Sequence, residues 1–283
     1  MLVEKITSRQ NPLVKRFRRV RAMGERQHVF LEGVRLIEDA LSTGARFESV
    51  AFTAELESSA RGSALLTTLR GVSCRGALVS KQVMEAIADT QTPQGVAAIV
   101  SRPYIELDDL FANPVSLLVI ADGLQDPGNL GTIIRTAEAA GADGLVTTRD
   151  TVDAFNEKAI RASMGSALRL PVVTGARRSE IVARCRDHKI KLIASYAAPN
   201  RTKTVEDASE VVKLSTEVDM TGPIAFIVGS EAAGLPKTAE VDADEFVHIP
   251  MAKGVESLNV SAAAAMLLYE AARQRGFQSS RGK

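Results

Sequence analysis

The sequence predicts an α/β fold with two domains, and three observations lead to that prediction. Hydrophobic runs of strand length alternate with segments of helical period along most of the chain. The apolar run Val115–Ala121 has the length of a strand buried on both faces of a sheet. The chain is 283 residues long, which is more than one domain usually needs and is comfortable for two.

The first hundred residues predict the smaller domain, in which helices and strands alternate. Gly33–Gly44, for example, gathers its apolar residues on one helical face and ends on a glycine. The other helices are expected at 8–20, 60–69 and 81–89, and the strands at 29–31, 49–53 and 95–100. Ser101–Pro114 is acidic, holds two prolines and has no clear period, so we expect a domain over residues 1–100 and a linker over 101–114.

Residues 115–276 predict a larger domain built on a mostly parallel sheet with helices on both faces. Helices are expected at 128–140, 155–164, 179–188 and 259–275, and strands, besides the run at 115–121, at 144–147, 171–174, 191–196, 211–214, 224–228 and 246–249. Residues 277–283 are expected to form a flexible tail. Ligands of such sheets bind beyond the carboxyl ends of the strands, so a functional site is expected there.

Charge is unevenly distributed along the chain. The net charge is only +1, but residues 1–30 hold eight basic side chains against two acidic ones. Such an excess suits an arm that neutralises the phosphates of a nucleic acid, although the solvated face of an amphipathic helix has the same composition. The basic residues expected to contact a nucleic acid are Arg9, Lys15, Arg16, Arg18 and Arg19.

Composition disfavours several classes of protein. Cys74 and Cys185 lie far apart and the three histidines are scattered, so we expect no metal site and a reduced, intracellular setting. No apolar segment has the length of a membrane span and no signal-peptide core follows the basic N-terminus, so we expect no membrane contact and a cytoplasmic location. There is no phosphate-loop or dinucleotide fingerprint, and an aromatic content of 4% argues against a base-stacking surface.

Three clusters of glycine and polar residues follow predicted strands of the second domain. They lie at 122–131, with Arg135 shortly after, at 229–236, and at 249–261. Any one of them could be a set of turns. Three in this order, each at a strand end, indicate one composite site.

In the first cluster, Asp126 can cap a helix whose first residue is Pro127. Asn129 then lies in the first turn beside backbone N–H groups that have no helical partner. Arg135 lies off the apolar stripe, where it can reach a cleft or a partner. Turn chemistry alone explains the glycines, but we favour a functional role for Asn129 and Arg135 together.

The other two clusters offer backbone and polar groups at strand ends. Gly229 ends a predicted strand, where the missing Cβ lets a ligand approach the backbone. Glu231 is either solvated or held by a cationic partner. Ser257 is a possible helix cap, and Asn259 would lie in the first turn. The run Ala262–Ala265 would let a second subunit pack closely.

These clusters resemble the three motifs of the SpoU/TrmH branch of the SPOUT methyltransferases. All three occur in the family order and at family-like spacing over about residues 115–275, and the matching segments are 129–137, 229–235, 249–251 and 257–261. The first hundred residues are similar to the L30e-like substrate-binding domain that is often fused to this family. That similarity rests on the segments 8–15, 30–33 and 92–96.

The resemblance implies an enzyme that methylates the 2′-hydroxyl of a ribose in structured RNA, with S-adenosyl-L-methionine as cofactor. It implies a trefoil-knotted α/β domain, which general rules of chain topology would have rejected. It also implies a homodimer joined through the C-terminal domain, with the methyl-donor site beside the subunit interface. The favoured substrate is 23S or large-subunit rRNA, because L30e-like modules bind kinked or looped RNA in ribosomal settings; the enzyme would then act in rRNA processing.

Site residues carry over from the family motifs one by one. The expected catalytic set is Asn129, Arg135, Glu231, Ser257 and Asn259, and the expected cofactor set is Ser195, Val228, Gly229, Ile249, Met251 and Leu258. A guanidinium stays protonated to about pH 12 and is a poor base. Arg135 is therefore expected to orient the hydroxyl, stabilise the developing alkoxide and bind phosphate. The asparagines would position the hydroxyl, and Glu231 would hold Arg135.

Other functions are open. The target could be a tRNA, or an rRNA site whose methylation confers antibiotic resistance, because fold resemblance does not choose a substrate. A non-catalytic RNA-binding or ribosome-assembly factor is a further alternative, against which the intact polar residues of the motifs speak. A nucleotide-binding oxidoreductase is disfavoured by the missing glycine fingerprint.

Overall fold

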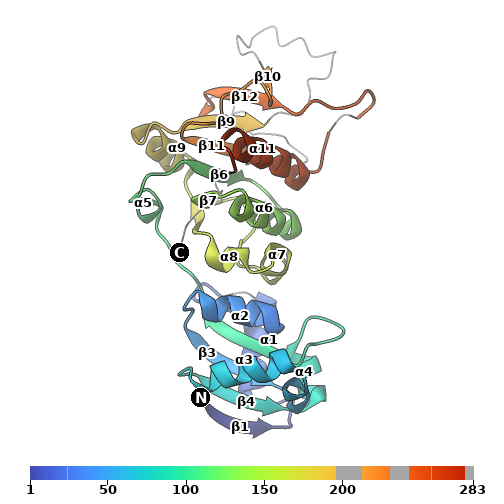
Figure 1. The fold of residues 1–283 in the computed structure, drawn as a ribbon. Helices are drawn as coiled ribbons and strands as arrows, with labels where there is room; N and C mark the ends of the chain where they lie inside the picture. Colours follow the sequence, from blue (N-terminus) through green and yellow to red (C-terminus); the bar gives the residue numbers. More distant parts are fainter. Residues whose placement is uncertain (24, 196–211, 230–241, 256, 278–283) are drawn as a thin grey trace. The chain divides into compact units, whose positions relative to one another are not determined.

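The structure of the chain is a computed structural model, and it describes residues 1–283 apart from 24, 196–211, 230–241, 256 and 278–283. By their internal contacts the residues form two compact units (Figure 1). The N-terminal unit holds Met1–Pro103 and Phe155–Arg169, and the C-terminal unit holds Tyr104–Ala154 and Leu170–Lys283. The backbone therefore passes between the units three times. The domain limits predicted from the sequence, 1–100 and 115–276, stay a prediction.

The N-terminal unit is built on a mixed sheet, of which five strands lie in the described residues. In spatial order they are β1 (Leu2–Ile6), β4 (Arg75–Val79), β3 (Phe47–Phe52), β5 (Val96–Ser101) and β2 (His28–Glu32). β5 runs antiparallel to both of its neighbours, and the other pairs are parallel. The helices are α1 (Pro12–Met23), α2 (Val34–Ser42), η1 (Ala54–Ser58, a 3-10 helix), α3 (Ala60–Arg70), α4 (Lys81–Ile87), α7 (Glu157–Ser163) and α8 (Ser166–Arg169).

Helix α1 is held to this sheet by a regular apolar stripe. Its residues Leu13 and Phe17 are buried and pack with α4 and with strand residues such as Ile99 in one core. The sequence does not predict β1, because four of its five residues are exposed. An exposed strand shows no alternation of apolar and polar residues, and that alternation is the signal by which strands are recognised.

The C-terminal unit is built on a parallel sheet, and seven of its strands fall within the described part of the chain. In spatial order they are β10 (Val212–Leu214), β12 (Glu245–His248), β9 (Lys191–Ser195), β11 (Ile224–Gly229), β6 (Leu117–Asp122), β7 (Gly144–Thr148) and β8 (Val172–Ala176). Every residue of β6 is buried, as expected for a strand covered on both faces. The predicted α/β class with a parallel sheet is confirmed.

Helices cover both faces of this sheet. They are α5 (Leu107–Leu110), α6 (Pro127–Ala139), α9 (Arg178–Asp187) and α11 (Val260–Gln274). α6 and α11 lie side by side (Figure 1), and α9 packs against other strand residues through Ile181 and Cys185. α5, whose Leu110 is buried in the same core as α9, lies in the segment predicted to be the linker, where the sequence shows no clear period. Four residues are too few to show a helical period.

The carboxyl ends of the parallel strands lie along one edge of the sheet. This edge carries Asp122 at the end of β6, Gly229 at the end of β11 and Ser195 at the end of β9, with Ile249 just after β12. In the register of the sheet, Gly229 lies opposite Asp122. The described parts of the three clusters therefore meet at this edge.

Candidate functional site

Helix α6 begins where the first cluster predicted it. The Asp126 side chain accepts a hydrogen bond of 2.7 Å from the backbone N–H of Asn129, and Pro127 is the first helical residue. Just before the cap, Gly123 has a φ of +70°, and its N–H donates to the side-chain oxygen of Thr151 at 3.0 Å. The chain can therefore turn sharply out of β6 and still present Asn129 at a fixed place.

Helix α11 begins beside α6, and one side chain joins the two helices. Asn259 is the N-cap, and its Oδ1 accepts from the backbone N–H groups of Ser261 and Ala262 at 2.9 and 3.3 Å. Its Nδ2 donates to Oδ1 of Asn129 at 3.0 Å. Because the cap occupies the oxygen, the amide nitrogen must face Asn129. The first and third clusters are thus joined across 130 residues of sequence.

Two other catalytic candidates are exposed. Ser257 does not cap α11, so that part of its prediction is wrong: the residue directly before the helix is Asn259, and its side chain takes the capping bonds. Arg135 lies on α6, off the buried stripe, and forms no ion pair with another described residue. Glu231 lies outside the described residues, so its contact with Arg135 stays a prediction.

The residues predicted to hold the cofactor gather at neighbouring strand ends. They are Ser195, Val228, Gly229, Ile249, Met251 and Leu258. They end β9 or β11, follow β12, or precede the cap of α11, and β12, β9 and β11 are neighbours in the sheet. Val228 is buried, and the other five are half-buried. Backbone groups at strand ends, together with half-buried apolar side chains, fit a nucleoside such as the adenosine of S-adenosylmethionine.

The sequence did not predict an ion-pair cluster that includes Asp122, the last residue of β6. Arg178 pairs with Asp122, and its Nε lies 2.9 Å from Oδ2 of Asp242. The side chains of Arg178 and Asp122 are only 18% and 9% exposed. The available signal was an arginine directly before the predicted helix 179–188, near a helix start where carboxylates are the favoured residues. That signal does not reveal the partners.

The basic residues predicted to contact RNA divide into two groups. Those that are exposed are Arg9, Lys15, Arg18 and Arg19. Arg19 also lies 3.3 Å from Glu25, but its side chain stays 61% exposed. Arg16 keeps only 19% of its side chain exposed, pairs with Glu25, and lies 2.8 Å from Glu48. Hydrogen bonding to Glu48 raises the pKa of the Arg16 guanidinium, against the opposing effect of burial. Its two carboxylate partners occupy Arg16 within the fold, so we withdraw it from the predicted RNA surface.

Titratable groups also occur away from this edge of the sheet. Within the described residues, no group of three or more His, Cys, Asp or Glu side chains could hold a metal ion. In the same part of the chain, no helix is both long and apolar enough to cross a membrane. Burial raises the pKa of the Cys185 thiol to about 12, so this thiol is a poor nucleophile at neutral pH.

Comparison with known proteins gives matches along the whole chain. Residues 116–269 match the SpoU rRNA Methylase family, and residues 5–98 match the MRM3-like substrate binding domain. The chain is 36% identical to an uncharacterized tRNA/rRNA methyltransferase of Synechocystis sp., over 99% of this chain and 97% of that protein. It is 32% identical to the 23S rRNA (guanosine(2553)-2′-O)-methyltransferase of Bacillus subtilis, over 94% of this chain and 98% of that protein.

A solved structure supports the same assignment. The AdoMet-bound rRNA methyltransferase from Sinorhizobium meliloti superposes with a TM-score of 0.80 at 28% identity, covering 96% of this chain and 98% of that chain. Its cofactor is the one that the sequence predicts here. The SpoU match includes all three motifs and more than half of the residues, so the predicted family is confirmed. The chain belongs to the SpoU rRNA methylase family.

Proposed function

We propose that this protein transfers a methyl group from S-adenosyl-L-methionine to the 2′-hydroxyl of a ribose in 23S rRNA. The observation that carries the proposal is the hydrogen bond between Asn259 and Asn129, because it joins the first and third family motifs at the edge where the cofactor residues lie. The substrate comes from a relative that is named as a 23S rRNA 2′-O-methyltransferase. The bound cofactor would supply an electrophilic methyl group on a sulfonium.

The paired asparagines would place the ribose and take no part in bond making. Their amides are held by each other and by the cap of α11, so they keep one orientation. A fixed orientation lowers the entropic barrier to bringing the hydroxyl to its donor. Ser257, exposed just ahead of this cap, is the further polar group that we assign to the ribose.

Arg135 would act on the charge that develops in the reaction. Its guanidinium stays protonated and can only donate hydrogen bonds, so it would orient the hydroxyl and stabilise the forming alkoxide while the hydroxyl proton passes to water. It would also bind a phosphate of the RNA. Its exposure on α6 supports this role, because no carboxylate of the described residues occupies it. Glu231 would hold the guanidinium in place.

The cofactor site and the knot belong to the same proposal. The residues that would hold the cofactor are Ser195, Val228, Gly229, Ile249, Met251 and Leu258. The order of the strands supports a knot at this edge, because β11 lies between β6 and β9 while β10 and β12 lie beyond β9. Since its substrate is ribosomal RNA, the protein would work in the cytoplasm.

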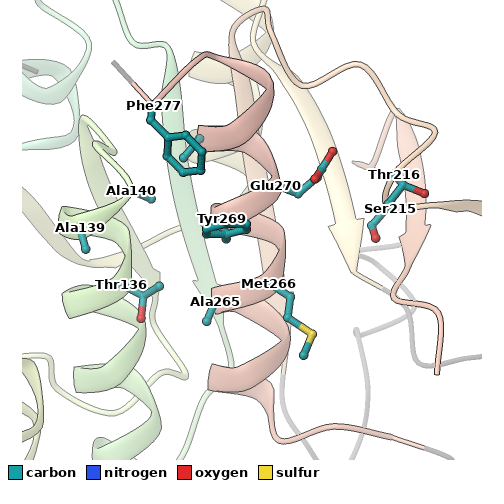
Figure 2. A pocket seen from close by; sticks show the side chains of 11 residues that line it. Thr136, Ala139, Ala140, Ser215, Thr216, Ala265, Met266, Tyr269, Glu270 and Phe277 are labelled. Carbon is teal, nitrogen blue, oxygen red and sulfur yellow. The ribbon is translucent and has the colours of Figure 1, made fainter. Parts of the chain in front are cut away.

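A homodimer through the C-terminal unit is also proposed. α6 and α11, with the end of β10, line a hollow of about 560 Å³ (Figure 2). Small residues such as Ala139 and Ala265 line it, while Met266 and Tyr269 are 49% and 61% exposed. Apolar side chains gathered in this way mark an interaction surface. A second copy that presents the same two helices about a twofold axis would cover it.

RNA recognition would fall mainly to the N-terminal unit. The match to a substrate binding domain covers residues 5–98, which include α1 and its exposed basic side chains. The residues that we assign to the RNA backbone are Arg9, Lys15, Arg18 and Arg19. Such contacts would provide affinity and position the RNA without reading its sequence.

The experiment that tests this proposal is a map of ribose methylation on all RNA from cells with and without the gene. We expect one 2′-O-methyl group to disappear from 23S rRNA, and to return with the wild-type gene but not with Arg135→Ala. A methyl group lost from tRNA instead would keep the chemistry and replace the substrate. If no RNA loses a methyl group while ribosome assembly is impaired, a non-catalytic assembly factor is the correct function.

A further inference from the structure

Arg178 lies at the carboxyl edge of the parallel sheet, among the strand ends to which we assign the cofactor. It is the first residue of α9 and is held by two carboxylates, Asp122 and Asp242. The side chains of the three residues are 18%, 9% and 25% exposed, in that order. Charges are costly to remove from water, so a largely buried cluster of three points to a role beyond solubility.

Nothing in helix α9 itself favours an inward-facing arginine at this position. The first turn of a helix carries partial positive charge and favours carboxylates. Arg177, the residue before Arg178, avoids this positive charge by reaching into water. Its side chain is 59% exposed and lies 3.5 Å from Glu180 of α9. Arg178 points the other way, and its two carboxylate partners lie outside the helix. The sequence thus provides a matched pair of adjacent arginines with opposite surroundings.

The two ion pairs of Arg178 join segments that are far apart in the sequence. Asp122 ends β6 and lies opposite Gly229, the last residue of β11. Asp242 lies three residues before β12, the strand that leads to Ile249. The planar guanidinium presents several N–H groups in a rigid fork, so Nε and Nη1 can each engage a different carboxylate at the same time.

We propose that Arg178 is a positioning residue for S-adenosylmethionine: by tying Asp122 to Asp242, it fixes the spacing between Gly229 and the strand that leads to Ile249. Arg178 touches neither the methyl donor nor the ribose. The inference rests on the proposed function, because it takes the backbone near Gly229 and Ile249 as the cofactor site. It has a selective consequence: without the tie, cofactor binding weakens, while methyl transfer at saturating cofactor proceeds at nearly the same rate.

The test is calorimetric titration of the full-length protein with S-adenosylmethionine alone. In Arg178→Met and in Asp242→Asn the Kd rises about tenfold, the lower end of what residues behind a ligand-holding shell contribute at metal sites. Arg178→Lys recovers part of the loss, because it keeps the charge but not the fork. The double variant Arg178→Met/Asp242→Asn has a Kd no higher than that of either single variant, because each substitution removes the same tie. Arg177→Met, the matched control, keeps the wild-type Kd.

Methylation kinetics and thermal unfolding separate positioning from a merely structural role. Positioning raises the cofactor KM and leaves kcat within about twofold. A lower melting temperature with a wild-type Kd in both Arg178→Met and Asp242→Asn overturns the proposal. If Arg178→Met fails to fold, Asp242→Asn decides, because that residue is more exposed and keeps its shape. A wild-type protein that binds no S-adenosylmethionine would reject the proposed function itself, which is a different outcome.

Discussion

Arg16 in α1 and Arg135 in α6 show two uses of the same type of side chain, one in each unit. Arg16 in α1 is engaged by Glu25 and Glu48 and is mostly shielded from water. Arg135 in α6 is exposed and has no ion-pair partner among the described residues. The sequence predicted both as contacts for RNA. The difference teaches that an arginine is available for a ligand only where no carboxylate of another element reaches it first.

Removal of Arg135 should produce the largest effect. Arg135→Ala should lower single-turnover methylation about 10³-fold, the scale on which a donor to a developing oxyanion acts. The melting temperature and the affinity for S-adenosylmethionine should stay at wild-type values, because the side chain supports no described contact. Arg135→Lys should fall in between, since it keeps the charge and loses the fork. More than a tenth of the activity left in Arg135→Ala would remove the residue from the mechanism.

Removal of Arg16 should lower the stability of the fold and leave the function of the protein unchanged. Arg16→Met removes the guanidinium between Glu25 and Glu48, which keep His28 as a shared partner. It should destabilise the fold by about 2 kcal/mol, less than the ~3–5 kcal/mol measured for fully buried pairs. Urea unfolding would measure the change. Affinity for RNA should not change at temperatures where the variant is folded. Weaker RNA binding with unchanged stability would return Arg16 to the RNA surface.

The exposed side of α1 offers a third test of the comparison. Lys15→Ala combined with Arg18→Ala should lower RNA affinity about tenfold at low salt and reduce the slope of log K against log salt by about 1.4–1.8. Filter binding at several salt concentrations would measure the slope. Stability should change by less than about 0.5 kcal/mol, because both side chains are exposed. Arg16→Met is the matched control, and a wild-type slope in the double variant would place RNA binding elsewhere.

The asparagine pair can be separated into its two functions. Asn259→Ser keeps a side-chain oxygen for the cap of α11 but loses the donor to Asn129, and Asn259→Ala loses both. Stability should fall by about 1 kcal/mol only in the alanine variant. Activity should fall about fivefold or more in both, because each removes the hydrogen bond by which Asn259 orients the Asn129 amide. Wild-type activity in Asn259→Ser would show that the pair serves the helix alone.

Most strands and helices could be predicted from the sequence, and most of the misses share a physical cause. The central strands of the parallel sheet are buried on both faces, so their runs stand out within a residue or two of the observed ends. β1 is exposed, and α5 and α8 have four residues each, so none of them carries a periodic signal. β4 was missed as well, although three of its five residues are buried, because its glycine and alanine give little strand signal. Local pattern predicts an element only when the element buries a face.

The site was predicted in part, and the partners were not. Serine and asparagine both cap helices well, so the sequence could not decide between Ser257 and Asn259; the backbone decides. Asn129 and Asn259 were both identified, but their hydrogen bond spans 130 residues. Arg178 finds its carboxylates 56 and 64 residues away. Contacts of that range follow from the topology of the sheet and leave no trace in the spacing of the sequence.

The smallest expected effect is the pH dependence of the Arg16 network. The hydrogen bond from Arg16 lowers the pKa of Glu48 below its ordinary value of 4.5, and burial opposes the shift. Because the folded-state pKa is the lower one, this contribution to stability is fully present above about pH 4.5 and is lost as the pH falls through the folded-state pKa. Melting curves between about pH 7 and pH 3 would detect the loss.

Glu48→Gln removes the titrating group, so its melting temperature should fall less steeply on the acid side than that of the wild type. Arg135→Ala should follow the wild-type curve at every pH, because no described carboxylate depends on that arginine. If all three curves ran parallel, the ion pair between Arg16 and Glu48 would add nothing to stability. The difference between the ion-paired Arg16 and the exposed Arg135 would then rest on the exposure of their side chains alone.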